Sequence, residues 1–512
     1  MAYPARYHGI IRLPDNDSAA CRNVTDTRSQ LPRKNPMPQR ATKIVATLGP
    51  ASSDPVLLEQ MIRAGVNVVR LNFSHGKAQD HIDRADMVRA AARRAGVEVA
   101  IMADLQGPKI RVGKFAEGKV MLEDGAPFVL DAARGEPGDI GGVGLDYKEL
   151  PRDVRPGDTL LLNDGLIVLE VERVAGEAVH TIVRIGGELS NNKGINKMGG
   201  GLTAPALTAK DMDDIKTAMS LQADYVAVSF PKNATDMELA RQLCLVAAPS
   251  GHRPGLIAKI ERAEAIPQLE AILRVSDGIM VARGDLAVEV GNAAVPALQK
   301  HMIRLAREMD KVVITATQMM ESMITNPVPT RAEVSDVANA VLDGTDAVTL
   351  SAETAAGRYP LQTVQEMAKI CQAAEAADSY EIESDFTGKT FERIDHTIAM
   401  GALFTASHLG AKAIVALTES GSTALWMSRH KVSMPIYAVT SKLAAQRKMA
   451  LYRGVRPLLM DTSADRDTAL QQAENHLKQR GIVQGGDVYA ITCGEPMGTP
   501  GGTNMLKICR AR

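Results

Sequence analysis

The sequence predicts an α/β fold, a (β/α)8 TIM barrel with an inserted β-rich domain and a C-terminal α/β domain. Between residues 42 and 350, short runs rich in β-branched residues alternate with helical patterns, which is typical of βα units in a parallel sheet. Eight runs of this kind favour a closed barrel. The predicted strands are Lys43–Leu48, Val68–Asn72, Ala100–Asp104, Tyr225–Ser229, Leu256–Ile260, Gly278–Val281, Val312–Thr315 and Ala347–Leu350.

Apolar residues at helical spacing between these runs predict the helices that would cover the barrel. They are Val56–Ala64, Ile82–Ala95, Ala209–Ser220, Ala234–Ala247, Ile266–Val275, Pro296–Glu308, Glu333–Leu342 and Leu361–Ala377. One connection breaks this rhythm, because Gly107–Thr203 is rich in glycine and Asp-Gly turns and holds short strands such as Gly157–Leu162 and Leu166–Val171. We interpret it as an inserted β domain, which at the barrel mouth would be placed to act as a lid.

The predicted boundaries divide the chain into four parts. Residues 1–40 are polar and contain prolines but no signal-peptide core, so we expect a disordered arm; a second interpretation is that translation starts at Met37. The barrel would comprise residues 41–107 and 204–380, and the lid domain residues 108–203. The charged segment Ser379–Lys389 marks a boundary before a domain at 381–512, with predicted strands at Ala413–Leu417, Ile436–Val439, Arg456–Met460, Val488–Ile491 and Leu506–Ile508.

Composition excludes several classes of function. The 59 Lys and Arg residues against 60 Asp and Glu residues leave a formal net charge of −1, so we expect no nucleic acid and no membrane surface as a partner. No apolar run is long enough to span a membrane. The five cysteines are scattered and form no C-x-x-C pair, which favours reduced thiols in a cytoplasmic protein over disulfides or a zinc site.

Lys259 and Glu261 stand at the end of a predicted strand, and side chains two residues apart in a strand share a face. An ordinary ion pair would explain the two residues by themselves. However, the active site of a barrel is built from the carboxyl ends of its strands, and other predicted strands also end in polar residues. These are Arg70–Gly76, Asp104, Arg283–Asp285, Thr317 with Gln318, and Ser351 with Glu353. This clustering favours a catalytic site.

Two cations beside two carboxylates suit phosphoryl transfer, which depends on positioning and charge neutralisation. Glu261 and Asp285 offer hard oxygen ligands for Mg²⁺, whose shell the substrate could complete. Arg70 offers a planar fork for phosphate, and Lys259 a compact charge on the transferring group. The sequence has no P-loop and no kinase glycine loop, so metal ions and side chains would have to hold the phosphates.

Six motifs together resemble the pyruvate kinase family from Thr42 to the end of the chain. They are Thr42–Pro50, Arg70–Gly76, Asp104–Arg111, Ala258–Glu261, Ala282–Leu286 and Ala316–Met323. The resemblance implies transfer of the phosphoryl group of phosphoenolpyruvate to ADP, followed by protonation of the enolate, which gives pyruvate and ATP in glycolysis.

The resemblance also implies roles for single residues. Arg70 would bind the phosphoryl group, Lys259 would stabilise its charge, and Glu261 with Asp285 would hold one Mg²⁺ while a second arrives with ADP. The substrate carboxylate would meet Ala282, Arg283, Gly284, Asp285 and Thr317. Proton supply would involve Thr317, Ser351 and Glu353. The nucleotide would contact Pro50, Asn72, His75, Arg111 and Lys193. A helix-capping pair is the alternative interpretation of Ser351 and Glu353.

Lys109 departs from the commonest family pattern. Many relatives carry glutamate there and need a potassium ion, whose region resembles Asn72, Ser74, Asp104 and Leu105 in this chain. An ammonium at that point would supply a fixed charge and repel a second cation. We therefore predict that K⁺ is not required, and the run of Leu105, Gln106, Lys109 and Val112 resembles the potassium-independent branch.

The C-terminal domain carries a run of hydroxyl groups before a helix predicted to begin near Ala424. Hydroxyls and backbone N–H groups at a helix start suit phosphate, although for this run alone a Ser/Thr N-cap is the favoured explanation. The resemblance implies an allosteric phosphate site there, formed by Thr418, Ser420, Gly421, Ser422 and Thr423. The loop Gly494–Asn504 would close it and lacks the tryptophan and arginine of bisphosphate-activated relatives, which favours a sugar or nucleotide monophosphate as effector. The family also implies a homotetramer.

Two other functions fit parts of this pattern. Another Mg²⁺-dependent barrel enzyme that handles a pyruvate enolate, such as an aldolase or lyase, would use the same carboxylates but would not need the insert or Arg70 and Lys259 together. A catalytically inactive sugar-phosphate sensor would keep the fold, yet every charged position expected for chemistry is filled.

Overall fold

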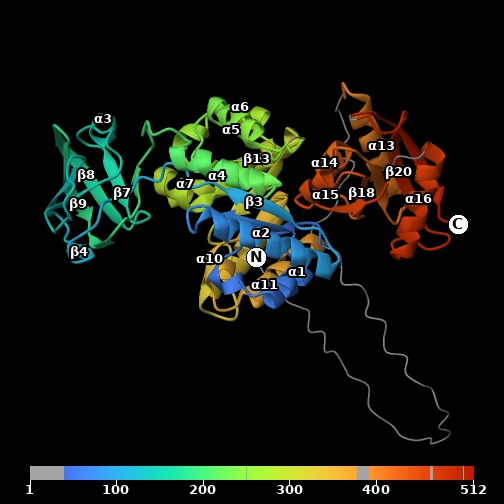
Figure 1. Cartoon of the computed structure of the whole chain (residues 1–512), viewed down its shortest axis with the longest axis horizontal. Helices are drawn as coiled ribbons and strands as arrows, with labels where there is room; N and C mark the ends of the chain where they lie inside the picture. The colour runs from blue at the N-terminus through green and yellow to red at the C-terminus, as the bar shows by residue number, and fades with distance from the viewer. Residues whose placement is uncertain (1–39, 250, 378–390, 462–464, 500) are drawn as a thin grey trace, which may run out of the picture. The chain divides into compact units, whose positions relative to one another are not determined.

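The computed structural model describes residues 40–249, 251–377, 391–461, 465–499 and 501–512 (Figure 1). The predicted arm before residue 40, the alternative start at Met37 and the boundary Ser379–Lys389 lie outside the described residues.

The predicted barrel is confirmed. Eight strands form a closed sheet in the order β1-β16-β15-β14-β13-β12-β3-β2, and all neighbouring pairs are parallel. Their β-branched and aliphatic side chains are almost all buried, which explains why each run reads as continuously apolar. The strands are β1 Lys43–Thr47, β2 Val68–Asn72, β3 Ala100–Asp104, β12 Tyr225–Val228, β13 Gly255–Ile260, β14 Gly278–Ala282, β15 Val312–Ala316 and β16 Ala347–Leu350.

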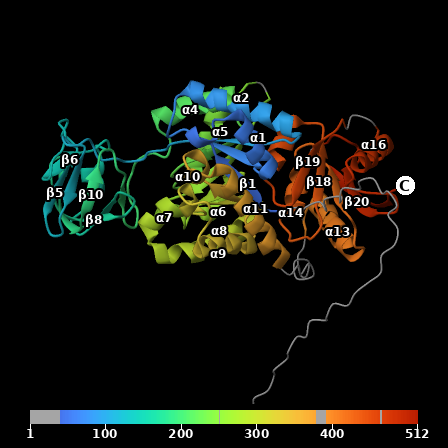
Figure 2. The same ribbon diagram turned by 90° about the horizontal axis from the view of Figure 1, so that it is seen from below.

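Helices surround these strands, and α8, α9 and α11 lie side by side on the outside of the barrel (Figure 2). Helix α9 shows how the sequence sets the ends of a helix: Thr330 and Glu333 form a capping box, and Gly344 ends the helix with φ +94°. The barrel helices are α1 Pro55–Ala64, α2 Ala78–Ala95, α4 Ala209–Ser220, α5 Ala234–Ala247, α6 Leu269–Val275, α7 Arg283–Val290, α8 Val295–Glu308, α9 Arg331–Asp343, α10 Ala352–Ala355 and α11 Pro360–Ala377.

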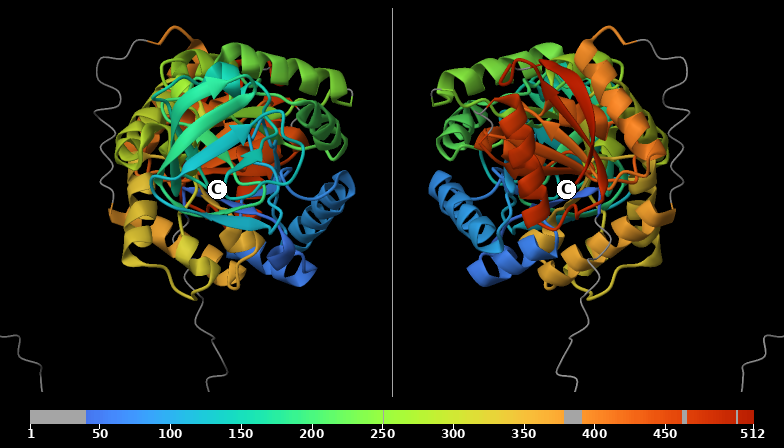
Figure 3. Two further views of the ribbon diagram at one scale, coloured as in Figure 1. Left: turned by 90° about the vertical axis from the view of Figure 1, so that its left-hand side faces the viewer. Right: turned by 90° about the vertical axis from the view of Figure 1, so that its right-hand side faces the viewer.

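The inserted segment folds as a β domain, with a six-stranded sheet in the order β11-β7-β8-β9-β5-β6 and a two-stranded sheet of β10 and β4 (Figure 3, left). Its core is separate from that of the barrel and is built around residues such as Phe128, Leu160 and Leu169. The elements are β4 Lys119–Leu122, β5 Pro127–Asp131, β6 Gly142–Gly144, α3 Leu150–Asp153, β7 Thr159–Leu162, β8 Ile167–Ala175, β9 Ala178–Ile185, β10 Gly187–Ser190 and β11 Ile195–Lys197.

The C-terminal domain is α/β, as predicted, with a five-stranded sheet in the order β19-β18-β17-β20-β21. Helices α13 and α16 cover opposite faces of this sheet (Figure 3, right), and each packs into its own hydrophobic cluster. The elements are α13 Ile394–His408, β17 Ile414–Leu417, α14 Ser422–Ser428, β18 Ile436–Thr440, α15 Leu443–Met449, β19 Val455–Leu459, α16 Arg466–Gln479, β20 Val488–Gly494 and β21 Thr503–Arg510. Among the described helices, none is long and apolar enough to cross a membrane.

Candidate active site at the barrel mouth

A buried carboxylate, Asp104, joins the two cations that the sequence singled out. Arg70 lies within β2 and Asp104 at the end of the neighbouring strand β3, and the Arg70 Nε donates to Asp104 Oδ2 at 2.5 Å. Lys259 Nζ on β13 lies 3.3 Å from Asp104 Oδ1. Asp104 is only 1% exposed, so both cations are held against it where water screens little.

Lys259 is held by three oxygen atoms. Besides Asp104, its ammonium lies 2.9 Å from Glu261 Oε1 and donates to Ser229 Oγ at 2.7 Å. Burial opposes the charge of Lys259, but Asp104 and Glu261 outweigh it and raise the pKa of the ammonium. The ion pair considered for Lys259 and Glu261 therefore exists, and it belongs to a larger charged cluster.

Glu261 lies in surroundings that disfavour the ionised form of its carboxylate. Burial and the neighbouring Asp285 raise the pKa of Glu261 to about 7, although Lys259 opposes the shift. Its Oε2 accepts a single backbone hydrogen bond, from Phe230 N at 2.9 Å. Two nearby carboxylates, one of them desolvated, fit a divalent cation with oxygen preference. No cluster of three or more metal-ligating side chains occurs in the described ranges, so other ligands would have to come from substrate and water.

The turn after β15 has a strained backbone and is held by hydrogen bonds from Arg283. Thr317 and Gln318 have φ of +72° and +54°, which is costly for a β-branched residue and often marks a functional site. Arg283 donates to the carbonyl oxygens of Ala316 and Thr317 at 3.2 and 2.6 Å. Asp336 in turn pairs with Arg283 at 2.7 Å.

The first turn of α7 presents backbone N–H groups to the same turn. Helix α7 was not predicted, and it begins at Arg283, so the first N–H groups of Arg283, Gly284 and Asp285 have no partner within the helix. Gly284 N donates to Thr317 Oγ1 at 2.8 Å. A helix start of this kind suits an anionic group.

Ser351 and Glu353 follow β16 directly. The Glu353 carboxylate is 2% exposed and accepts from Ser351 N at 2.6 Å and from Met320 N at 3.2 Å. Burial raises the pKa of Glu353. Glu353 therefore binds backbone N–H groups, close to the capping interpretation, whereas the Ser351 side chain makes no capping hydrogen bond.

The residues expected to meet the nucleotide fall into two groups. Pro50 and His75 are exposed near the ends of β1 and β2, and Asn72 accepts from Ser74 N at 3.1 Å. In the inserted segment, Arg111 donates to Asn192 O at 3.0 Å, and Lys193 accepts a backbone bond from Val112. Across the residues that the structure describes, no hydrogen bond joins the two groups.

Lys109 lies at a different carboxylate from the one expected. Its ammonium is 3.8 Å from Asp285 Oδ1, while Asp104 is engaged by Arg70 and Lys259. Leu105 is buried, and its carbonyl accepts from Ser229 Oγ at 2.7 Å. The structure thus brings Lys109 to the rim but pairs it with Asp285 rather than with the Asn72, Ser74 and Asp104 group.

In the C-terminal domain, a small pocket joins the two loops expected to hold a phosphate. Thr418, Ser420, Ser422 and Thr423 line one side, and residues of the loop from Gly494 to Thr503 line the other. Thr423 Oγ1 and Thr503 Oγ1 lie 2.8 Å apart, and Thr418 Oγ1 accepts from Gly421 N at 3.0 Å. Gly421 is needed there because its φ is +88°.

Sequence reasoning missed two hydroxyl groups of the site. Ser229 links Lys259 to the carbonyl of Leu105, and Thr47 accepts from Arg70 at 3.1 Å and donates to Leu350. Both residues are buried at strand ends. The sequence does show a hydroxyl residue at the carboxyl end of each of these predicted strands. Such residues are common and uncharged, so they do not by themselves indicate a functional site.

The fold and the rim together define the class, a parallel barrel enzyme with an inserted β domain and a charged, poorly solvated cluster at the carboxyl ends of its strands. Comparison with known proteins identifies the family. The model "Pyruvate kinase, barrel domain" matches residues 39–364, and "Pyruvate kinase, alpha/beta domain" matches residues 396–509.

Relatives agree with these matches. Pyruvate kinase II of Salmonella typhimurium is 52% identical over 474 residues, which cover 92% of this chain and 98% of the relative. The pyruvate kinases of Buchnera aphidicola subsp. Baizongia pistaciae and Haemophilus influenzae are each 49% identical, over 92% of this chain and 99% and 98% of their own lengths. The chain therefore belongs to the pyruvate kinase family, a family of phosphotransferases.

Proposed function

We propose that this protein transfers the phosphoryl group of phosphoenolpyruvate to ADP and then protonates the enolate, which makes pyruvate and ATP in glycolysis. The observation that carries the proposal is the convergence of Arg70 and Lys259 on buried Asp104, beside Glu261. Two positive charges held in a desolvated place can stabilise a phosphoryl group in transit. A lyase or aldolase has no use for that pair, and family membership speaks against this alternative.

Enzymes of this family generally use Mg²⁺, and the rim fits such an ion. Glu261 and Asp285 would hold it, with substrate oxygens and water as further ligands, and a second ion would arrive with ADP. A bound metal ion would supply Lewis-acid stabilisation of the enolate and phosphate oxygens. Its charge would also favour the ionised form of Glu261, whose pKa is raised to about 7 without it.

The residues at the barrel mouth have separate roles in this reaction. Arg70 binds the phosphoryl group and Lys259 neutralises its charge. The substrate carboxylate meets the N–H groups of Ala282–Asp285 at the start of α7, with Thr317 beside them. Thr317, Ser351 and Glu353 form the proton-supply region. Because the Glu353 oxygens already accept backbone bonds from Ser351 and Met320, Glu353 acts on the proton path indirectly, by positioning the backbone of Ser351.

The domain boundaries stay as proposed, with the barrel at 41–107 and 204–380, the lid at 108–203 and the C-terminal domain at 381–512. Pro50, Asn72 and His75 would meet ADP from the barrel, and Arg111 and Lys193 from the lid. Their separation into two groups suits a lid that closes over the nucleotide and excludes water.

Potassium independence remains our proposal, although Lys109 pairs with Asp285 and not with the group of Asn72, Ser74 and Asp104. Lys109 at 3.8 Å from Asp285 places a fixed positive charge at the rim, where it would oppose a further monovalent cation. We expect replacement of K⁺ by tetramethylammonium at constant ionic strength to change the maximal rate less than about twofold, because the charge is already supplied. A drop of more than about tenfold would contradict the proposal. In Lys109→Glu, K⁺ should become an activator.

Regulation and assembly extend the proposal. The pocket of Thr418–Thr423 and Gly494–Thr503 would bind a phosphorylated effector. Its small size favours a monophosphate, as does its lining, which has no basic side chain among the described residues. A homotetramer in the cytoplasm would supply the bistable assembly that allostery needs. Activation only by a sugar bisphosphate at micromolar concentrations would overturn the effector assignment.

A coupled assay of ADP-dependent pyruvate formation tests the central proposal. Turnover is expected with phosphoenolpyruvate, ADP and Mg²⁺ together, and none when one of the three is omitted. An inactive sensor would bind sugar phosphates but show no turnover, and a lyase would form pyruvate without ADP.

A further inference from the structure

Ser229 lies between the ammonium of Lys259 and the segment that follows β3. Its hydroxyl donates to the carbonyl of Leu105 at 2.7 Å and accepts from Lys259 Nζ at 2.7 Å. A hydroxyl has a single proton, and because Leu105 receives it, the oxygen presents a lone pair to Lys259. The Ser229 side chain therefore fixes the direction in which the ammonium lies.

The surroundings of this hydroxyl leave it little room to move. Ser229 is 1% exposed, and a Cβ at Gly107 would lie only 2.8 Å from the Ser229 Cβ. The N–H of Leu105 donates to the carbonyl of Ala227 at 3.0 Å, so Leu105 is bound to the end of β12 through both of its backbone groups. The barrel itself sets the position of the hydroxyl.

The next residue, Phe230, holds the carboxylate of Glu261. Its backbone has φ +56°, which is costly for a bulky residue, and its N–H donates to Glu261 Oε2 at 2.9 Å. The Arg262 guanidinium lies over the Phe230 ring, 5.6 Å from the centroid, and donates to the carbonyl of Leu202 at 3.1 Å. A strained backbone that the surrounding contacts enforce often marks a functional site, which favours a role for this corner in the reaction.

We propose that Ser229 is a positioning residue for phosphoryl transfer, an inference that rests on the proposed function. Its hydroxyl aims the Lys259 ammonium at the transferring group, while Asp104 and Glu261 supply the opposite charge. Because Ser229 is buried and uncharged, it acts through Lys259 and not on the substrate. A charged group in transit is stabilised only by a cation that is already in place, so the loss of this one bond should slow the transfer step.

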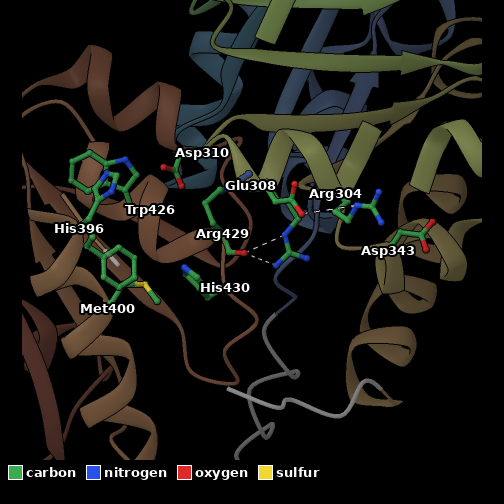
Figure 4. Close-up of a pocket in the computed structure, with 11 residues that line it drawn as sticks. Arg304, Glu308, Asp310, Asp343, His396, Met400, Trp426, Arg429 and His430 are labelled. Atoms are coloured by element: carbon green, nitrogen blue, oxygen red, sulfur yellow. Dashed lines mark hydrogen bonds and ion pairs between the residues drawn. The ribbon is translucent and has the colours of Figure 1, made fainter. Parts of the chain in front are cut away.

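Ser428 in the C-terminal domain has the same bonds and serves as a matched control. Its hydroxyl donates to the carbonyl of Leu425 at 2.6 Å and accepts from Arg429 Nη2 at 2.8 Å. Arg429 pairs with Asp346, directly before β16, so it lies at the amino-terminal ends of the barrel strands, away from the rim. Figure 4 shows Arg429 at a cavity outside the active site.

Ser229→Ala tests the role. We expect kcat for ADP-dependent pyruvate formation to fall at least about tenfold, with the KM for phosphoenolpyruvate changed less than about twofold, because Lys259 acts on the group in transit. The exchange of methyl protons of pyruvate through its enolate should keep its rate, since it needs no phosphoryl transfer. An unchanged kcat, or equal losses of transfer and exchange, would overturn the proposal.

Ser428→Ala should leave kcat, KM and proton exchange unchanged. Both variants lose a buried hydroxyl bonded to a cation and a carbonyl, so their unfolding midpoints in urea should fall by similar amounts. An equal loss of kcat in Ser428→Ala would show that the effect in Ser229→Ala is a general consequence of lost stability. Failure of the proposed function would look different, because the unchanged protein would then show no turnover.

A double variant tests whether Ser229 acts through Lys259. In Ser229→Ala with Lys259→Met, the transfer rate should equal that of Lys259→Met alone, because no ammonium is left for the hydroxyl to aim. A further loss of about tenfold in the double variant would show that Ser229 acts independently of Lys259, and would refute the assignment.

Discussion

Two buried aspartates at opposite ends of the barrel, Asp104 and Asp346, show how differently a charge can be used. Each is 1% exposed and each meets an arginine. Asp346 accepts from Val313 N at 2.9 Å, from Arg453 N at 3.0 Å and from two nitrogen atoms of Arg429. All its lone-pair directions are used, so Asp346 joins the C-terminal domain to the barrel as a structural group.

Asp104 is much less well satisfied. Its Oδ2 accepts from Arg70, whereas its Oδ1 has no hydrogen bond within the described residues and only the ammonium of Lys259 at 3.3 Å. Arg70 and Lys259 share this one carboxylate, so each can still bind an anionic ligand. The contrast teaches that saturated buried charges hold a fold together, while unsaturated ones are held ready for a ligand.

Removing Lys259 should cause the largest loss of activity. In Lys259→Met the phosphoryl group in transit would lack its charge partner, and we expect ADP-dependent pyruvate formation to fall about 10³-fold or more. The exchange of methyl protons of pyruvate through its enolate should persist, because it needs no phosphoryl transfer. Loss of deuterium from deuterated pyruvate, measured by NMR, reports this exchange. Loss of both reactions in a folded variant would show that Lys259 has another role.

Removing the charge of Asp346 should instead cost stability. In Asp346→Asn, buried Arg429 would lose its counter-ion, and we expect about 3–5 kcal/mol of destabilisation. The single tryptophan, Trp426 on α14, reports unfolding in urea by fluorescence. Asp213→Asn removes an exposed pair with Lys216 and should change little. If the two variants unfolded at the same urea concentration, the structural role of Asp346 would be wrong.

Much of the fold could be predicted because the signals are local. Every barrel strand begins and ends within two residues of its prediction, since continuous β-branched runs between turn residues leave few alternatives. Helix α7 was not predicted, because it is short and starts with the Arg283-Gly284-Asp285 motif, which resembles a loop. The residues Arg70, Lys259 and Glu261 were identified by charge at strand ends.

The missed parts of the site depend on tertiary contacts. Ser229 and Thr47 are neutral, and only the closure of the barrel brings them to Lys259 and Arg70. The pairing of Lys109 with Asp285 depends on how the segment after β3 folds back over the rim. No pattern within one strand or helix carries that information.

Glu289 is a third buried carboxylate, and its effect on the free energy of unfolding should depend on pH. Burial raises the pKa of Glu289 to about 7, while an unfolded glutamate titrates near 4.3. Its stabilising contribution is therefore full below about pH 4.3 and is lost as the pH rises through about 7. Glu289→Gln, which stays neutral, should stabilise the protein by up to about 3 kcal/mol at pH 8, with little gain at pH 4. Urea unfolding at both pH values measures this, and an equal gain at both would contradict the assigned titration.

Asp336 should show the smallest effect, because it acts on the site through Arg283. Asp336→Asn would loosen the guanidinium that holds the carbonyl oxygens of Ala316 and Thr317, and the strained turn could relax. We expect kcat to fall about tenfold, or ~1.4 kcal/mol, with the unfolding midpoint nearly unchanged and partial rescue in Asp336→Glu. Asp343 lies on the same helix as Asp336, and Asp343→Asn, which breaks a pair with Lys300 of α8, should leave kcat unchanged. A loss of stability in Asp336→Asn as large as that in Asp346→Asn, with normal kcat, would place Asp336 among the saturated structural charges instead.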